Sequence, residues 1–230
     1  MSLIRLNDMS KSYRLGNQTI AAVQGLTLNI EAGEFTVLAG PSGSGKTTVL
    51  NIVGALDTPS AGTVSVDGRA YSRMNARSLA DFRLRRIGFI FQSYNLIPVL
   101  TAAENAEFTL MLQGVPPTER REKIAALFAE LGITGLEGRR PNDLSGGQQQ
   151  RVAIARAMAP QPAVILADEP TANLDSHTAE ELLQLMRRLN REKGTTFLFS
   201  SHDPLVIAHA ERVISLRDGQ LENDLQQEIR

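Results

Sequence analysis

A glycine-rich segment with a single lysine has the residue types that hold the phosphates of a nucleotide. It fits the pattern G-x-x-x-x-G-K-[ST], and the matching residues are Gly40, Pro41, Ser42, Gly43, Ser44, Gly45, Lys46 and Thr47. Glycines let the main chain wrap so that its N–H groups point inward at phosphate oxygens. Lys46 is expected to reach the β- and γ-phosphates and the Thr47 hydroxyl to bind Mg²⁺, with Thr48 beside them at a helix start. The alternative is a glycine-rich turn before a helix, and the motif alone does not say what the nucleotide drives.

Two carboxylates end an apolar stretch later in the chain. Asp168 and Glu169 follow residues 163–167, which are all apolar. If that stretch is a strand of a parallel sheet, its acids lie at the same edge as the phosphate loop. Asp168 is then expected to hold Mg²⁺, and Glu169 to orient or deprotonate the attacking water. The alternative, acids that cap a buried strand in solvent, is favoured only if the phosphate loop is disregarded.

A second glycine-rich segment precedes a stretch of helical character at residues 149–158. It consists of Ser145, Gly146, Gly147 and Gln148 and lacks a lysine. Main-chain N–H groups at a helix start attract an anion, yet the chain has one complete phosphate loop and so one evident triphosphate. A two-fold dimer resolves this, because each segment would close over the nucleotide held by the other chain's phosphate loop. The alternative is a glycine-rich helix cap.

The elements that position these residues alternate between short apolar stretches and helical periodicity. Strands are expected at residues 20–30, 35–39, 63–67, 87–91, 163–167, 195–200 and 212–216. Helical spacing lies between them, in 124–131 behind Thr118 as N-cap, in 179–186 behind Asp175, and in Val49, Ile52, Val53 and Leu56. This alternation predicts an α/β fold with a mostly parallel sheet covered on both faces. The largely helical stretch at residues 93–158 is expected to be a lobe inserted into the core.

The composition excludes several classes of protein. The 230 residues carry a net charge of −1, 42% of them are hydrophobic, and none is cysteine. The near-neutral charge argues against a nucleic-acid partner, because such proteins usually present a basic surface. The longest apolar run is six residues, at 124–129, against about twenty for a membrane-spanning helix. With no export signal and no cysteine, a cytoplasmic location is expected.

The phosphate loop, the LSGGQ segment at residues 144–148 and the Asp168-Glu169 pair together resemble the nucleotide-binding domain of ATP-binding cassette (ABC) transporters. The resemblance covers nearly the whole chain. It implies a RecA-like P-loop NTPase core with a mostly parallel sheet, an antiparallel β portion and an inserted helical subdomain. Residues 1–230 would form one ABC ATPase domain, with 1–92 and 159–230 as the catalytic core and 93–158 as the helical subdomain. The implied cofactors are ATP and Mg²⁺.

The resemblance also assigns roles outside the glycine-rich segments. Gln92 matches the glutamine that touches Mg²⁺ and links the core to the helical lobe, and Asp175 lies in the loop that contacts the partner subunit. His202 matches the switch histidine near the γ-phosphate, and Tyr13 matches the aromatic residue that stacks on adenine. Judged as single residues, Gln92 equally suits a polar strand end, His202 a structural histidine and Tyr13 a packing aromatic.

Within this family the sequence is similar to the bacterial lipoprotein-release and macrolide-export ATPases, and to the cell-division ATPase of the same branch. The similarity implies a subunit that hydrolyses Mg-ATP in a head-to-tail homodimer and drives a separate integral membrane permease, for export, lipoprotein release or mechanotransmission. The subunit would be cytoplasmic and peripheral on the inner membrane through that permease. The apolar residues at 96–100 would receive a permease helix or fill the helical lobe. Alternatives are a regulatory ABC ATPase of the cell-division type and a soluble ABC ATPase without a transport role.

Overall fold

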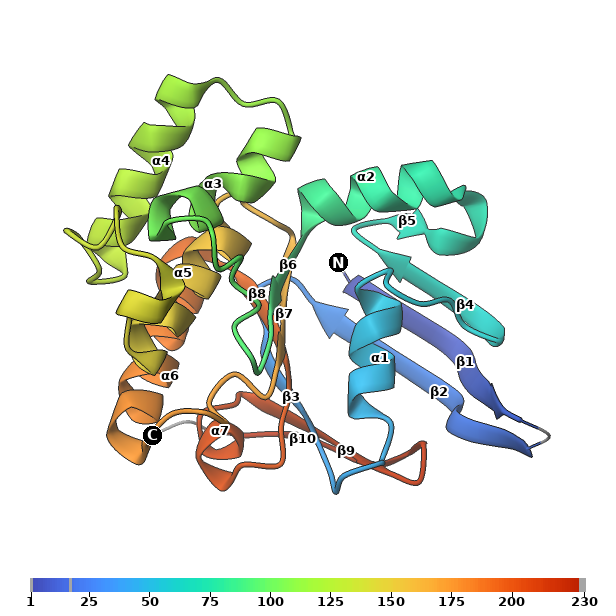
Figure 1. Ribbon diagram of the computed structural model, residues 1–230. Coiled ribbons are helices and arrows are strands. Elements are labelled where there is room, and N and C mark those ends of the chain that lie inside the picture. Colours follow the sequence, from blue (N-terminus) through green and yellow to red (C-terminus); the bar gives the residue numbers. More distant parts are fainter. Residues whose placement is uncertain (1, 17, 228–230) are drawn as a thin grey trace.

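Two β-sheets, with helices between and around them, build the protein (Figure 1). The computed structural model describes residues 2–16 and 18–227. Within these residues a mostly parallel sheet forms the expected α/β core, and the antiparallel portion forms a separate sheet. The predicted fold class is therefore confirmed. In the same part of the chain, no helix combines the length and the apolarity needed to cross a bilayer.

The larger sheet has the strand order β10-β9-β3-β8-β7-β6. Its strands are β3 (Phe35–Ala39), β6 (Ile87–Ile90), β7 (Val164–Asp168), β8 (Thr196–Ser200), β9 (Arg212–Arg217) and β10 (Gln220–Gln226). Neighbouring strands are parallel, except that β10 runs antiparallel to β9. Every residue of β3 and β8 is buried, as strands covered on both faces must be. The carboxyl ends of the parallel strands meet at one edge, where β3 leads into the phosphate loop.

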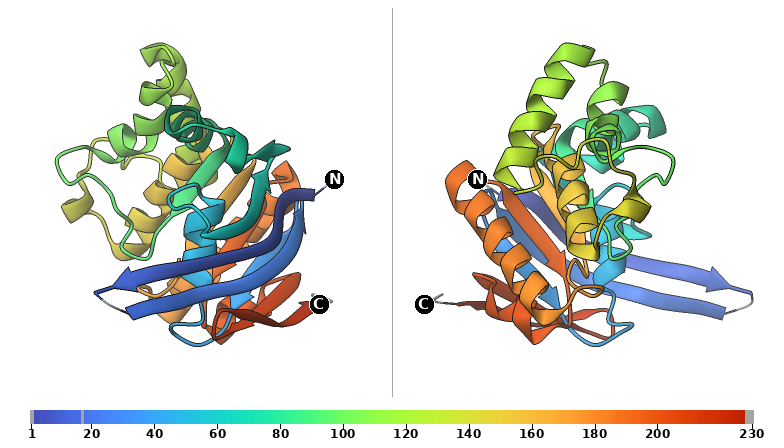
Figure 2. Two further views of the ribbon diagram at one scale, coloured as in Figure 1. Left: turned by 90° about the vertical axis from the view of Figure 1, so that its right-hand side faces the viewer. Right: turned by 60° about the vertical axis from the view of Figure 1, so that its left-hand side comes forward.

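The smaller sheet is antiparallel and has the order β2-β1-β4-β5. Its strands are β1 (Ser2–Leu15), β2 (Gln18–Glu31), β4 (Ala61–Val66) and β5 (Arg69–Ala70). Strands β1 and β2 form a long hairpin that projects from the body of the protein (Figure 2). Leu6 and Leu28 in the inner part of this hairpin are buried, whereas Leu15 and Ile20 near its tip are exposed. The apolar patterns predicted β2 and β4 but missed β1 and β5.

Helix α1 (Lys46–Val53) lies between the two sheets and contacts strands of both (Figure 1). Three of its four expected apolar positions are buried, namely Val49, Ile52 and Val53. The fourth, Leu56, lies beyond the helix and is 48% exposed, so this part of the prediction is wrong. The helix ends early because Ala55 adopts a left-handed conformation (φ 55), and the N–H groups of Ala55 and Leu56 bond back to carbonyls of the last turn.

The segment at residues 93–158, all of it described, contains three α-helices and no strand: α3 (Ala102–Leu112), α4 (Pro117–Glu130) and α5 (Gly146–Met158). The expected helix behind Thr118 is present, but Thr118 is not its N-cap, so that prediction is wrong. Pro116 occupies the N-cap position and Pro117 is the first helical residue. Proline suits that position, because its fixed φ is helical and its missing N–H would have no partner there.

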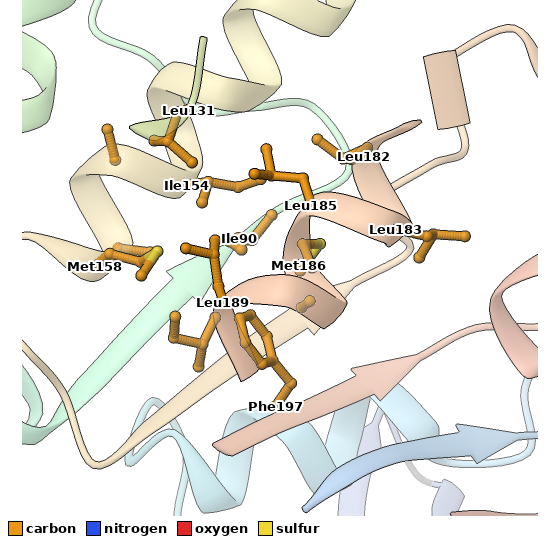
Figure 3. Close-up of a cluster of buried hydrophobic side chains, with 14 of the residues drawn as sticks. Ile90, Leu131, Ile154, Met158, Leu182, Leu183, Leu185, Met186, Leu189 and Phe197 are labelled. Carbon is orange, nitrogen blue, oxygen red and sulfur yellow. The ribbon is translucent and has the colours of Figure 1, made fainter. Parts of the chain in front are cut away.

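The remaining helices cover the sheets, and short 3₁₀ turns lie at η1 (Tyr71–Arg73) and η2 (Pro141–Asp143). They are α2 (Ala76–Arg86), α6 (Ser176–Lys193) and α7 (Pro204–Ala208). Helix α6 begins after Asp175, as expected, and packs its apolar stripe against α5 and the larger sheet (Figure 3). The four expected apolar positions of this helix are all buried, namely Ala179, Leu182, Leu183 and Met186.

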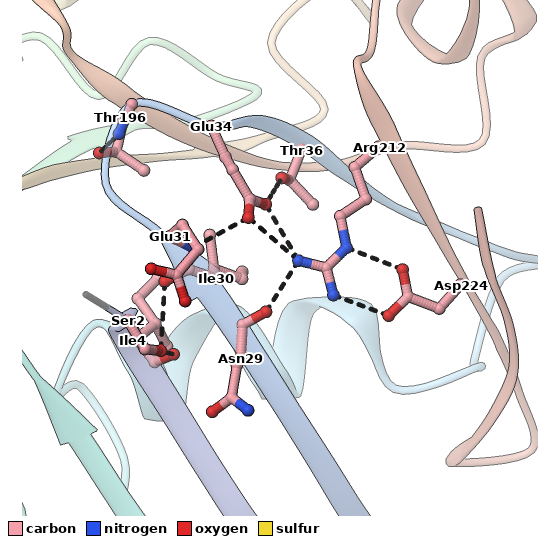
Figure 4. A network of polar contacts seen from close by, with 11 residues as sticks. Ser2, Ile4, Asn29, Ile30, Glu31, Glu34, Thr36, Thr196, Arg212 and Asp224 are labelled. Atoms are coloured by element: carbon pink, nitrogen blue, oxygen red, sulfur yellow. Dashed lines mark hydrogen bonds and ion pairs between the residues drawn. The ribbon is translucent and has the colours of Figure 1, made fainter. Parts of the chain in front are cut away.

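Arg212 at the start of β9 joins the two sheets at the edge away from the phosphate loop (Figure 4). Its Nε and Nη2 each donate to one oxygen of Asp224 on β10, both at 2.7 Å. Its Nη1 donates to the main-chain oxygen of Asn29 on β2 at 2.8 Å and to the carboxylate of Glu34. The hydrogen bonds to Asp224 and Glu34 outweigh burial and raise the pKa of Arg212 above its ordinary value. This network fixes β2, β9 and β10 relative to the start of β3.

Candidate functional site

A cavity of about 500 Å³ opens at the carboxyl edge of the larger sheet. It is lined by the loop at residues 42–48 and by Gln92, Glu169 and His202. These residues follow four different parallel strands, β3, β6, β7 and β8, so the sheet topology brings them together as the sequence predicted.

The loop between β3 and α1 surrounds the lysine side chain. Lys46 is only 7% exposed, and its Nζ donates to the main-chain oxygens of Gly40 and Pro41 at 2.7 and 2.9 Å. Gly40 has a φ of 144, and a Cβ there would lie 2.2 Å from the main-chain oxygen of Leu216, so only glycine fits. Gly45 precedes α1, and no side chain caps the first turn of this helix. Free N–H groups and a cation therefore face the same cavity, which suits a polyphosphate.

Two hard oxygen ligands lie beside the lysine. The Thr47 hydroxyl donates to Oδ1 of Asp168 at 3.2 Å. Mg²⁺ prefers such oxygens and keeps several waters and phosphate oxygens in its coordination shell. Among the described residues, no cluster of three or more His, Cys, Asp or Glu side chains could hold a metal ion. The Thr47–Asp168 pair supplies the kind of oxygen ligands that suit an Mg²⁺ ion bound with phosphates.

Glu169 has both carboxylate oxygens occupied by partners on the segment after β8. His202 Nδ1 lies 2.7 Å from Oε1, and the Ser201 hydroxyl donates to Oε2 at 2.7 Å. An ionised carboxylate only accepts, so a proton on Nδ1 of the imidazole would complete this hydrogen bond. The main chain of Glu169 is left-handed (φ 45), which is uncommon outside glycine, and its N–H donates to Ser200 at 2.9 Å. This conformation and these contacts hold the carboxylate beside the cavity.

Two residues to which the sequence assigned no such role hold the Gln92 loop, and one of them, Asn173, lies in the loop with Asp175 that was expected to contact a partner subunit. The Asn173 side-chain amide donates to the main-chain oxygen of Gln92 at 2.8 Å. Arg156 on α5 donates to the main-chain oxygens of Tyr94 and Asn95 at 2.8 and 2.5 Å. Burial lowers the pKa of Arg156. Their partners lie 61 to 81 residues away in the sequence, so no local pattern could have revealed them.

The segment from Ser145 to Gln148 does not line the cavity of its own chain. The Ser145 side chain accepts from the N–H of Gln148 at 3.3 Å, and the Gln148 side chain accepts from the N–H of Ser145 at 3.0 Å. This capping box starts α5. A Cβ on Gly147 would lie 2.6 Å from Thr178 Cγ2, so the glycine permits close packing on α6. Within one chain, then, the segment is a helix cap.

Asp175 also acts locally within the chain, as the N-cap of α6. Its Oδ1 accepts from the N–H of Thr178 at 3.0 Å, and its Oδ2 accepts from the hydroxyl of Thr178 at 2.6 Å. These hydrogen bonds lower the pKa of Asp175. The expected contact of Asp175 with a partner subunit involves a second chain and stays a prediction.

Tyr13 lies on the projecting hairpin and is 39% exposed. Its hydroxyl donates to Asp57 Oδ2 at 2.9 Å, and Lys11 Nζ lies 4.9 Å from the centre of its ring. Desolvation and the neighbouring Asp57 raise the pKa of Tyr13. The ring does not line the phosphate cavity, and its accessible surface is compatible with stacking. Asp57, which holds the ring, was not identified from the sequence.

A phosphate loop after β3, a Thr–Asp oxygen pair, and a carboxylate placed by a neighbouring strand together define a P-loop nucleoside triphosphatase. Residues 23–172 match the family model described as ABC transporter. The chain belongs to this family and is one of its ATPase cassettes.

Similar sequences and a similar solved structure support this assignment. An uncharacterized ABC transporter ATP-binding protein of Thermotoga maritima is 46% identical over 96% of this chain and 94% of its own length. The macrolide export ATP-binding/permease protein MacB of Brucella melitensis is also 46% identical over 96% of this chain, which spans only 34% of that protein. The dimeric post-hydrolysis structure of the ATP-binding cassette MJ0796 with ADP and Pi, from Methanocaldococcus jannaschii, has a TM-score of 0.89 and 43% identity. That match covers 97% of this chain and 98% of the other. The expected family is confirmed.

Proposed function

We propose that this chain is the ATP-binding subunit of a bacterial ABC transporter, hydrolysing Mg-ATP in a head-to-tail homodimer to drive a separate membrane permease. Export, lipoprotein release and mechanotransmission are the outputs that suit the branch of the family that the sequence resembles. The observation that carries the proposal is the Glu169 carboxylate, held by His202 and Ser201 beside the cavity of the phosphate loop. A binding module that only senses nucleotide has no need of a carboxylate fixed in this way.

Each residue of the cavity would have a separate role in phosphoryl transfer. Lys46, now bonded to two main-chain oxygens, would exchange these neutral partners for the β- and γ-phosphate oxygens and stabilise charge there. Thr47, Asp168 and Gln92 would hold Mg²⁺, which when bound neutralises charge on the phosphates. Glu169 orients the attacking water and accepts its proton, and His202 donates a hydrogen bond to the γ-phosphate.

A second copy of the chain would complete the site. Ser145, Gly146, Gly147 and Gln148 do not line their own chain's cavity, so contact with a nucleotide requires the cavity of a partner. The structure of MJ0796, which is 43% identical, is a dimer bound to ADP and Pi, and this supports a dimeric arrangement. ATP would then favour the closed dimer because it contacts both subunits only in that form, and hydrolysis would reopen it. Asp175, at the start of α6, would lie at the same interface.

The helical segment would transmit this motion to the permease. We place residues 93–158 in a helical subdomain and residues 1–92 and 159–230 in the catalytic core. Asn105 is buried and braces the loop before α3, since its side chain bonds to Ile97, Leu100 and Thr101. Val99 in this loop is 74% exposed, which suits an apolar contact with a permease helix. Such a contact would place the subunit at the cytoplasmic face of the inner membrane.

The Glu169→Gln variant tests the proposal. It should bind ATP as the wild type does, lose hydrolysis by at least about a hundredfold, and elute as an ATP-dependent dimer from a sizing column. Glu119→Gln, which changes an exposed carboxylate on α4, is the matched control and should hydrolyse ATP normally. Undiminished hydrolysis in Glu169→Gln would contradict the role of Glu169. Co-purification with a membrane subunit would test the permease partner.

A further inference from the structure

Ser201 is fully buried, and its hydroxyl has a defined direction. It follows β8, is 0% exposed, and its main-chain N–H donates to Leu38 of β3 at 3.1 Å. Its Oγ accepts from the N–H of Asp203 at 3.1 Å and donates to Oε2 of Glu169 at 2.7 Å. A hydroxyl has a single proton to donate. Because Asp203 supplies the hydrogen bond that Oγ accepts, the proton of Ser201 is committed to Glu169.

The partner that orients Ser201 is itself fixed. Asp203 Oδ1 accepts from the N–H of Leu205 at 2.9 Å, and its Oδ2 accepts from the hydroxyl of Thr171 at 3.3 Å. Thr171 is 3% exposed and lies two residues after Glu169. The chain of hydrogen bonds therefore returns to the segment that carries the carboxylate. Ser201, which donates to Oε2, is therefore held by contacts with β3, with the start of α7 and with the loop after β7.

The two oxygens of Glu169 have different surroundings. Oε2 faces the buried Ser201, whereas Oε1 faces His202, whose side chain is 71% exposed. An exposed side chain can exchange its partner for a ligand at little cost, and a buried hydroxyl with two fixed partners cannot. Only Oε1 is thus available to a water molecule in the cavity.

We propose that Ser201 is a positioning residue of the hydrolytic reaction, anchoring Oε2 of Glu169 so that Oε1 alone is aimed at the attacking water. The inference rests on the role proposed above for Glu169. Ser201 is buried and does not line the cavity, so it acts through the orientation of the carboxylate. Its loss should slow the chemical step and leave ATP binding unchanged.

Three variants separate the hydroxyl from mere packing. Ser201→Ala removes the hydroxyl, Ser201→Cys replaces it by a weak donor in a side chain of similar shape, and Ser201→Thr keeps a hydroxyl. We expect kcat to fall about tenfold in Ser201→Cys and in Ser201→Ala, with KM for ATP and the Kd of a non-hydrolysable analogue within about twofold of wild type. Ser201→Thr should retain kcat within about threefold. Phosphate release at saturating Mg-ATP gives kcat.

Thr196→Val is the matched control for fold stability. Thr196 starts the same strand, is 1% exposed, and its hydroxyl accepts from the N–H of Gly33 at 2.9 Å, at the opposite edge of the sheet. This variant should lower Tm and leave kcat unchanged. Wild-type kcat in Ser201→Cys and Ser201→Ala would overturn the inference. An equal loss of kcat in Thr196→Val, or a loss of ATP affinity as large as that of kcat, would also overturn it.

Glu169→Gln, measured in parallel, separates a failure of the Ser201 inference from a failure of the proposed function. If Glu169→Gln is inactive while Ser201→Cys and Ser201→Ala hydrolyse ATP normally, only the role of Ser201 is wrong. If Glu169→Gln itself hydrolyses ATP normally, the proposed function of the carboxylate fails, and the inference about Ser201 fails with it.

Discussion

The side-chain amide of Asn173 donates a hydrogen bond to the main-chain oxygen of Gln92, with 2.8 Å between nitrogen and oxygen. Asn173 lies, like Glu169, in the loop after β7, so this bond connects the loops after β6 and β7. Arg156, on α5 of the helical segment, donates to the carbonyls of Tyr94 and Asn95 in the same loop. The loop is therefore tied to the core on one side and to the helical segment on the other.

Removal of the core-side tie should slow hydrolysis without weakening nucleotide binding. Asn173→Ala leaves the main-chain oxygen of Gln92 without its donor. The Gln92 loop is then held by Arg156 on α5 but no longer by Asn173. We expect kcat to fall about three- to tenfold, with ATP affinity within about twofold of wild type. Asn75→Ala is the control, because it removes the N-cap of α2 and costs about 1 kcal/mol of stability far from the cavity. An Asn173→Ala enzyme with wild-type kcat would show that the tie has no part in turnover.

Loss of the lysine charge should act on binding itself. Lys46→Ala removes the cation from the cavity, and the main-chain oxygens of Gly40 and Pro41 lose their donor. We expect the affinity for ATP to fall at least about tenfold, measured by titration calorimetry. Lys123→Ala, at an exposed lysine on α4, should leave the affinity unchanged. Equal affinities of Lys46→Ala and wild type would contradict the assignment of the phosphate loop.

Local patterns were sufficient to predict the buried strands and the motif residues at their carboxyl ends. Strands β3, β7 and β8 are short and almost wholly apolar, and a parallel sheet places their ends together. Strand β10 could not be predicted in this way, because each of its residues is exposed. It is held by main-chain pairing with β9 and by the ion pair between Asp224 and Arg212, neither of which leaves an apolar pattern.

The residues that orient the site were beyond the reach of the sequence for a different reason. Ser201, Asn173, Arg156 and Asp57 each act through a hydrogen bond to a residue at least 32 positions away in the chain. Such partners are set by tertiary packing, and polar residues of these types occur on any surface. The segment from Ser145 to Gln148 shows the opposite case, in which a local pattern is visible but its role is not settled by one chain. Its residues suggested an anion site, and within one chain they form a capping box.

Two glycines of the phosphate loop should differ in how much stability they lose when replaced by alanine. At Gly40, with a φ of 144, a Cβ would lie 2.2 Å from the oxygen of Leu216 and 2.8 Å from Ser44 Oγ. At Gly43, with a φ of 81, a Cβ would meet nothing within 4 Å. We expect Gly40→Ala to cost about 3 kcal/mol or more through this clash, and Gly43→Ala about 1–2 kcal/mol through its main-chain conformation alone. Urea unfolding measures both, and equal losses would show that the close approach to Leu216 is unimportant.

The anchor of Tyr13 should make part of the stability depend on pH. Asp57 accepts from Lys11 Nζ at 2.6 Å, from the N–H of Thr58 at 2.7 Å and from the Tyr13 hydroxyl at 2.9 Å. Desolvation alone would raise the pKa of Asp57, but these hydrogen bonds outweigh it and lower the pKa below its ordinary value of 3.8. A carboxylate with a depressed pKa in the folded state stabilises that state above its unfolded pKa, and the contribution is lost as the pH falls through the folded value.

The free energy of unfolding should therefore differ most between wild type and Asp57→Asn above about pH 5, and the difference should shrink as the pH falls below 3.8. Urea titrations at intervals from pH 6 to about pH 3 measure this difference. Asp81→Asn is the control, because Asp81 pairs with Arg85 on the exposed surface of α2, where an ion pair contributes at most about 1 kcal/mol. A difference for Asp57→Asn that stays constant, or grows, under acidic conditions would mean that Asp57 is not held as a carboxylate by Lys11 and Tyr13.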